Sequence, residues 1–173
     1  MIIFLYGQDS YRISQKLKEI VSSYKAKNPS GLNFVILDFA ENNINDFYQA
    51  VKFDSFIPEK KLIIIKNVFH ADSEALLKFF QPKAGSPLAE KSTNLNKRDD
   101  IILVIIHFGN PLKSKLFEYL TEKPNQVQNF KLLKEYEIKN WAKRFLNSFG
   151  IELASDAMDF LVLNSGNNLW KLD

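Results

Sequence analysis

The sequence predicts an α/β protein: a doubly wound, parallel five-stranded sheet followed by a small all-helical domain. Short continuous apolar runs, typical of strands buried on both faces, alternate with segments whose apolar residues recur at helical spacing. Beyond about residue 133 only the helical spacing continues. With 173 residues, 46% hydrophobic and 25% charged, the composition is that of a globular protein and excludes disordered and fibrous classes.

The chain opens with an apolar run at residues 2–6, which predicts a first strand covered on both faces. A Gly-Gln-Asp-Ser turn follows, in which Asp9 or Ser10 can cap a helix. Apolar residues then recur at helical spacing over residues 10–27, until an Asn-Pro-Ser-Gly stretch ends the pattern. The first unit is therefore a strand, a tight turn and a helix.

The same alternation continues through the middle of the chain. Apolar runs predict strands, and apolar stripes at helical spacing predict helices. In chain order they are a strand at 34–39, a helix at 44–51, a strand at 62–65, a helix at 72–81, a strand at 101–106, a helix at 112–120 and a strand at 127–132. Residues 83–100 are rich in Gly, Ser, Pro, Asn and charge, which predicts a mobile surface insertion. We expect the α/β domain to span residues 1–133.

A small helical domain is predicted over residues 134–173. Its first helix carries an apolar stripe formed by Ile138, Trp141, Phe145 and Phe149. Gly150 ends this helix, and Ser155 is a suitable N-cap for the next one. A last element begins near Asn167 and stops at Asp173, too short to be stable alone. We therefore expect that a C-terminal part is missing.

Composition excludes several kinds of site. The chain has no cysteine, so it holds no disulfide framework and no thiolate metal site. His70 and His107 are its two histidines, and a His-rich metal centre is not expected. The longest apolar runs fall far short of the roughly 20 residues of a membrane-spanning helix. The apolar run that opens the chain lacks the features of a signal peptide. A net charge of +3 does not indicate a dedicated nucleic-acid binder.

The turn after the first strand lies where a doubly wound sheet would bind a phosphate. A Walker loop counted from Gly7 needs a glycine, a lysine and a hydroxyl residue where this sequence has Arg12, Ile13 and Ser14. Ser14 alone matches. Without the lysine the β- and γ-phosphates lack their counter-charge, so we expect a degenerate phosphate loop, no cofactor and no catalytic residue.

The third and fourth predicted strands also lack the acidic residue through which a P-loop ATPase holds Mg²⁺. They end in Lys66-Asn67 and His107-Phe108. A lone histidine at the end of an apolar run is more often structural than catalytic, so His107 is not assigned a role in proton transfer. Asp9 could serve as a phosphoacceptor, but capping of the first helix explains it more simply. No metal site is predicted.

The connection before the third strand, residues 53–61, carries three large apolar side chains. Either these side chains complete the core, or some of them form an exposed anchor for a partner protein. Pro58 and the charged triplet after it favour an ordered projection with a polar rim. The Lys-rich first helix leaves a similar choice between a solvated face, which is the simpler explanation, and contact with DNA.

The order of these pieces resembles the family of the delta subunit of the bacterial DNA polymerase III clamp loader, over essentially the whole chain. The similarity rests on the opening strand and loop at 3–11, on the loop, basic pair and apolar strand at 55–67, and on segments at 141–151 and 166–172. The second of these is the most specific. The resemblance implies an AAA+-like core and a helical lid, with the collar domain that normally follows absent.

The resemblance also implies a function, which is to bind and open the ring-shaped sliding clamp inside a loader whose other subunits bind ATP. In the family a hydrophobic pair in the loop before the third strand wedges against the clamp, and the matching positions are Ser55 and Phe56, followed by Ile57. Ser55 departs from the usual apolar residue, so the wedge is expected to shift to Phe56 and Ile57, or to be weaker. Trp170 stands where ATP-binding relatives place a sensor arginine.

The partners implied by the resemblance are the sliding clamp (beta subunit) and the other loader subunits in the bacterial cytoplasm, with DNA contacted indirectly or weakly and no membrane. Two other functions stay open. One is an active nucleotide-dependent enzyme, an ATPase or kinase, on the same scaffold. The other is the sister loader subunit that acts as a stator, which typically carries zinc-binding cysteines that this chain lacks.

Overall fold

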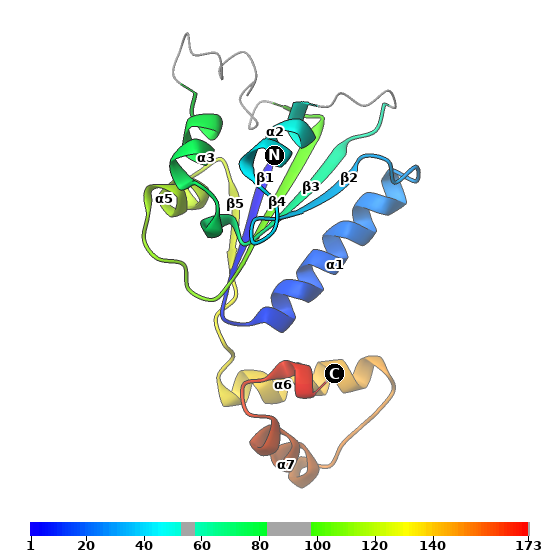
Figure 1. Ribbon diagram of the computed structural model, residues 1–173. Coiled ribbons are helices and arrows are strands. Elements are labelled where there is room, and N and C mark those ends of the chain that lie inside the picture. Colours follow the sequence, from blue (N-terminus) through cyan, green and yellow to red (C-terminus); the bar gives the residue numbers. More distant parts are fainter. Residues whose placement is uncertain (53–57, 83–97, 173) are drawn as a thin grey trace.

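The computed structural model describes residues 1–52, 58–82 and 98–172. Its centre is one sheet of five parallel strands in the order β2-β3-β4-β1-β5 (Figure 1). The strands are β1 (Ile2–Gly7), β2 (Phe34–Asp38), β3 (Lys61–Lys66), β4 (Ile101–Phe108) and β5 (Gln126–Asn129). The predicted α/β class with a parallel five-stranded sheet is confirmed.

Six α-helices and two short 3-10 helices lie within the described residues. They are α1 (Ser10–Lys27), α2 (Ile44–Lys52), η1 (Val68–His70), α3 (Ser73–Phe80), α5 (Lys115–Thr121), α6 (Glu135–Ser148), α7 (Ser155–Ser165) and η2 (Leu169–Lys171). The last predicted helix is thus a single 3-10 turn, η2. Most of the surface insertion predicted at residues 83–100 lies outside the described residues.

The strand order determines which face of the sheet each helix covers. The chain crosses from β1 to β2 in one direction, and the connections to β3, β4 and β5 then run in the opposite direction. Because such connections between parallel strands are right-handed, the first places α1 on one face and the others place α2, α3 and α5 on the other face. Figure 1 shows α1 on one side of the sheet and α3 and α5 on the other.

Two apolar clusters fill the space between the sheet and these helices. The larger one packs β-strand side chains such as Phe4 and Ile105 against Phe47 of α2 and Phe79 of α3, all at most 1% exposed. The other cluster, beneath α1, contains Ile13, Ile64 and Val104 among others. Each fully buried side chain of this size contributes roughly 1.5–3 kcal/mol, so both faces stabilise the sheet.

The last strand is shorter than predicted. The apolar pattern predicted a strand at 127–132, but β5 ends at Asn129. β5 is an edge strand that pairs with β1, and all four of its residues are exposed. An edge strand has no second neighbour whose hydrogen bonds would extend it. Phe130 instead turns inward and is 5% exposed.

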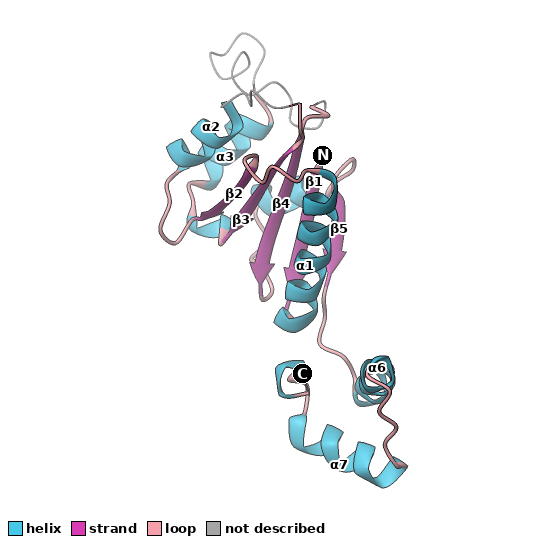
Figure 2. Ribbon diagram, turned by 90° about the vertical axis from the view of Figure 1, so that its right-hand side faces the viewer, coloured by secondary structure: helices cyan, strands magenta, loops and turns pink. Residues whose placement is uncertain are grey.

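The chain passes from β5 to α6 through residues 130–134, where the domain boundary predicted at residue 133 stays a prediction. Figure 2 shows α6 and α7 beyond the C-terminal ends of the strands. Their small apolar cluster contains Ile138, Val162 and Leu169, and it also includes Tyr11 of α1. None of the helices described is both long enough and apolar enough to cross a membrane.

Candidate functional site

The turn between β1 and α1 contains the predicted degenerate phosphate loop, and it is packed against the chain that follows β5. Gly7 has a φ of +137°, and a Cβ added there would lie 2.3 Å from the carbonyl oxygen of Phe130. The Asp9 backbone N–H donates to the same oxygen at 3.0 Å. The close approach of Phe130 therefore explains why the loop needs a glycine at this position.

Asp9 places a carboxylate at the N-terminus of α1. It is the N-cap residue, and its Oδ1 accepts a hydrogen bond from the Arg12 backbone N–H at 3.0 Å. Its Oδ2 pairs with Arg12 Nε at 2.6 Å, and Asp9 is only 4% exposed. Helix N-termini attract anions, and here the chain's own Asp9 carboxylate places a negative charge at this helix end.

Arg12 stands at the position of the second Walker glycine and connects the loop to the chain after β5. Its Nη2 donates to the carbonyl oxygen of Lys131, and its guanidinium lies 5.8 Å from the ring centroid of Phe130. The next residue, Ile13, stands in place of the Walker lysine and is fully buried beneath α1. Ser14, the one match to the motif, is partly buried on the same helix.

Trp170 covers the same loop from the C-terminal helices. Its Nε1 donates to Ser10 Oγ at 2.9 Å. The ring of Tyr11 lies edge-to-face against Trp170 at 5.1 Å and against Trp141 at 5.3 Å. The resemblance to ATP-binding relatives would place a sensor arginine at Trp170, whereas the indole forms a contact within the protein.

A cavity of about 450 Å³ remains between this loop and η2. Its lining combines Asp9, Ser10 and Tyr11 with residues of the C-terminal helices, and no basic side chain of the described residues lines it. Triphosphates are held in proteins by lysine or arginine together with backbone amides. Among the described residues that line the cavity, the charged side chain is Asp9.

The ends of β3 and β4 form no metal site. Asn67, which follows β3, has a left-handed backbone and donates from Nδ2 to Asp38 Oδ1 at 2.7 Å. The backbone N–H of Ala40 and this Asn67 amide hold the pKa of the Asp38 carboxyl below its usual value. Across the described parts of the chain, no three His, Asp or Glu side chains gather in a way that could hold a metal ion.

His107 lies near the end of β4. It is the neighbour of Tyr6 in the sheet, and its ring lies edge-to-face against Phe69 at 4.9 Å. Its Nδ1 is buried without a hydrogen-bond partner. Burial, with a smaller effect of nearby His70, lowers the pKa of His107. The neutral imidazole is therefore favoured near pH 7.

The amino-acid sequence matches a family model described as DNA polymerase III, delta subunit, over residues 4–140. The chain belongs to this family. The resemblance seen in the sequence is thereby confirmed, and it places this delta-family chain among replication proteins. No curated protein matches the sequence significantly.

Solved structures show the same fold as this delta-family chain. The DNA clamp loader delta protein of Bacillus subtilis aligns with a TM-score of 0.63 at 17% identity, over 99% of this chain and 50% of that protein. A variant of the RuvB protein of Thermotoga maritima aligns with a TM-score of 0.58 at 11% identity, over 98% of this chain and 51% of that one. Domain III of the Thermotoga maritima replication initiation protein DnaA gives 0.52 at 16% identity, over 99% and 71%. The chain spans about half the length of the delta protein it matches.

The residues predicted to bind the clamp, Ser55, Phe56 and Ile57, lie outside the described residues. The structure of this delta-family chain does describe the chain that follows them. The carbonyl oxygen of Lys60 accepts a hydrogen bond from the Tyr24 hydroxyl at 2.7 Å, and that of Glu59 accepts one from Asn33 Nδ2 at 3.0 Å. The segment that leads into β3 is thus fixed to the end of α1 and the start of β2.

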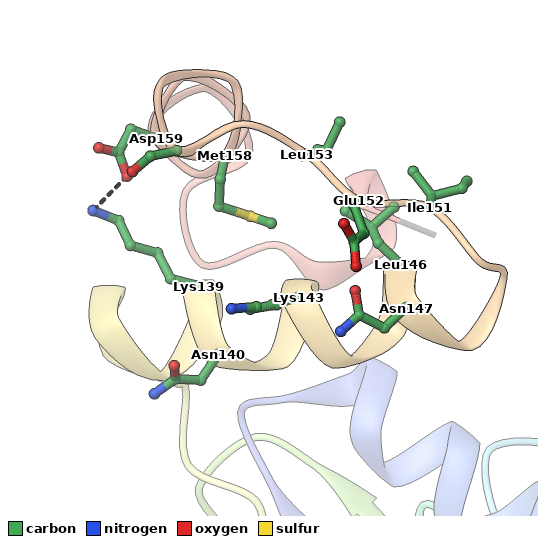
Figure 3. Close-up of a pocket in the computed structure, with 11 residues that line it drawn as sticks. Lys139, Asn140, Lys143, Leu146, Asn147, Ile151, Glu152, Leu153, Met158 and Asp159 are labelled. Atoms are coloured by element: carbon green, nitrogen blue, oxygen red, sulfur yellow. Dashed lines mark ion pairs between the residues drawn. The ribbon is translucent and has the colours of Figure 1, made fainter.

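A second cavity, also about 450 Å³, lies between α6 and α7 (Figure 3). Lys139 stands at its edge, where its Nζ contacts Asp159 at 2.8 Å and Glu135 at 3.4 Å. These carboxylates, Asp159 first, raise the pKa of Lys139. The apolar part of its lining comes from Leu146, Ile151, Leu153 and Met158. Nothing in the sequence of this delta-family chain had pointed to a cavity here.

Proposed function

We propose that this chain binds a ring-shaped DNA sliding clamp and favours its open form, as a component of a clamp loader whose other subunits bind ATP. Membership of the delta family and the fold shared with a clamp loader delta protein support this proposal. The observation that carries it is the internal ion pair of Asp9 and Arg12 at the N-terminus of α1. A carboxylate at this helix N-terminus disfavours a bound phosphate, which supports a role through protein contacts.

The clamp contact is proposed to lie at Phe56 and Ile57, with Ser55 beside them. Burying one such apolar side chain on a partner contributes roughly 1.5–3 kcal/mol. Two of them supply a differential affinity large enough to shift a conformational equilibrium of the partner, provided that the open clamp offers the better pocket. The helices after residue 133 are proposed to form a lid, fixed to the α/β part by the Trp170 and Tyr11 contacts.

Calorimetric titration of the chain against a bacterial sliding clamp tests the proposal. We expect the wild type to bind and the double variant Phe56→Ala/Ile57→Ala to lose at least about 100-fold in affinity, from the burial of two side chains. Leu163→Ala is the matched control, because this leucine is 82% exposed on α7. Unchanged urea midpoints in all three proteins exclude unfolding as the cause. Retained clamp affinity in the double variant would contradict the assignment.

An active nucleotide-dependent enzyme is the competing function, and Mg-ATP distinguishes it. The proposal predicts no shift of the thermal midpoint at millimolar Mg-ATP, since a ligand present at 100 times its Kd would stabilise the protein by about 2.7 kcal/mol. Binding at micromolar concentration together with hydrolysis would establish the enzyme instead.

A further inference from the structure

Of the helices in the described part of the chain, α1 alone covers one face of the sheet. α1 lies over β1 and β4. Next to it are two hollows of about 670 and 370 Å³, both lined by Ile3, Lys16 and Ile20. The two hollows share these three residues, and together we call them the α1 groove. Lys27, Lys60 and Ile102 also line it.

The floor of the α1 groove is apolar. Ile3 of β1, Ile20 of α1 and Ile102 of β4 line it, and each is only partly buried. At the far end, Val127 of the edge strand β5 is 40% exposed. Water contact with these side chains is unfavourable, so covering them with apolar groups of a partner would stabilise a complex.

The rim of the α1 groove is positively charged. The charged side chains that line it are Lys16, Lys27 and Lys60 and one carboxylate, Glu19, with a net charge of +2. Lys16 pairs with Glu19 at 2.7 Å, whereas Lys27 and Lys60 form no ion pair within the described part of the chain. A partner with carboxylates would complement this rim.

The combination of an apolar floor and a basic rim fits a protein better than a nucleic acid. Nucleic acids bind through phosphates and through bases stacked on exposed aromatic rings. The one aromatic residue that lines the described groove is Tyr24, which is only 4% exposed. Protein interfaces, in contrast, surround an apolar centre with charged and polar groups.

Two residues that line the α1 groove come shortly after the segment proposed to bind the clamp in the sequence. Pro58 and Lys60 line the end of the groove nearest the start of β3, and they follow residues 55–57 in the chain. We infer that the α1 groove is a second contact surface for the sliding clamp, taking a segment in which carboxylates flank apolar side chains. This inference rests on the proposed function.

The test compares two charge-reversal variants in binding to a bacterial sliding clamp, measured by surface plasmon resonance at low and high salt. Lys27→Glu/Lys60→Glu reverses the unpaired groove lysines. Lys18→Glu/Lys113→Glu makes the same change of net charge at exposed positions that do not line the groove. We expect the groove variant to lose about 10-fold or more in affinity, mainly through slower association, and the control less than about 2-fold. The difference should shrink at high salt.

The other outcomes contradict the inference, and they show whether the proposed function fails with it. If the wild type does not bind the clamp, the proposed function fails together with the inference. If the wild type binds and Phe56→Ala/Ile57→Ala abolishes binding, but both charge reversals act alike, the inference alone fails. A parallel titration with a fluorescent DNA duplex covers the remaining alternative. Loss of DNA binding in the groove variant with unchanged clamp affinity would make the groove a nucleic-acid site and overturn the inference.

Discussion

The indole Nε1 of Trp170 donates a 2.9 Å hydrogen bond to the hydroxyl of Ser10, a residue 160 positions earlier in the chain. Ser10 is the first residue of α1, and Trp170 belongs to η2. Tyr11, only 3% exposed, extends the contact through edge-to-face packing with Trp170. The protein's own side chains therefore join the C-terminal helices to the turn between β1 and α1.

Removing the indole of Trp170 should weaken the contact between the C-terminal helices and α1. Trp170→Ala loses the hydrogen bond and the aromatic pair with Tyr11, each worth about 0.5–1.5 kcal/mol, so the free energy of unfolding should fall by about 1–3 kcal/mol. Trp170→Phe keeps a ring and should lose about half as much. Urea unfolding measures both. Leu163→Ala, on an 82% exposed side chain, should stay within about 0.5 kcal/mol. An equally small effect of Trp170→Ala would show that the contacts of Trp170 with Ser10 and Tyr11 do not stabilise the fold.

Loss of the Arg12 side chain should destabilise the loop between β1 and α1. Arg12→Ala leaves the Asp9 carboxylate, whose side chain is 3% exposed, without its ion-pair partner. Oδ1 keeps its bond from the backbone N–H of residue 12, but Oδ2 loses its partner, and a buried oxygen left in this way costs about 1–3 kcal/mol. Lys16→Ala breaks the exposed pair with Glu19 and should cost less than about 1 kcal/mol. A double-mutant cycle with Asp9→Asn should give a coupling of about 0.5–3 kcal/mol, and zero coupling would refute the role assigned to the pair.

Gly7 should tolerate no side chain. A Cβ at this position would lie 2.3 Å from the Phe130 carbonyl oxygen, and φ is +137°. Backbone strain alone costs about 1–3 kcal/mol, and the clash adds to it, so Gly7→Ala should lower the free energy of unfolding by about 3 kcal/mol or more. Gly31→Ala is the control, since φ there is +66° but nothing lies within 4 Å. Its cost should be about 1–2 kcal/mol. Equal losses in the two variants would mean that the clash is relieved by movement of Phe130.

The sheet could be predicted from the sequence because its strands are local signals. β3 and β4 consist mainly of continuous apolar runs, which is the pattern typical of strands buried on both faces of a sheet. The edge strand β5 was predicted too long because Phe130 continues the apolar pattern although it serves the core under α1 and not a strand. Edge position is a property of the whole sheet, and a single run of residues does not reveal it.

The loop between β1 and α1 also shows that local sequence patterns do not reveal contacts between distant residues. The absence of a Walker lysine at Ile13 is a local feature, so the sequence alone predicted a degenerate loop. The bond from Arg12 to Lys131 joins residues 119 positions apart, and no spacing rule connects them. The α1 groove was likewise hidden, because a solvated face is the simpler explanation of a basic helix. The partly buried isoleucines beside α1 become apparent only once the strands are placed.

His107 should make the stability of the fold depend on pH. An unfolded chain titrates histidine near pH 6.5, and burial lowers the pKa of His107 in the folded protein. Between these two values the unfolded state binds more protons, so the free energy of unfolding decreases as the pH falls from about 7 through the lower, folded pKa. Above the pKa of histidine in the unfolded chain, the imidazole is neutral in both states. The free energy of unfolding then no longer changes with pH through His107.

Urea unfolding from pH 5 to 8 on the wild type and His107→Gln isolates this contribution. Burial also lowers the pKa of the Met1 ammonium, so the wild-type profile contains two groups, and the difference between the two proteins belongs to the imidazole. The Asp38 carboxyl titrates below its ordinary value near 3.8 and loses its contribution at still lower pH, outside this window. We expect the His107→Gln profile to be flatter between pH 5 and 7, because no proton is then taken up on unfolding at this position. Parallel profiles would mean that the pKa of His107 is the same in the folded and the unfolded protein, and that burial does not lower it.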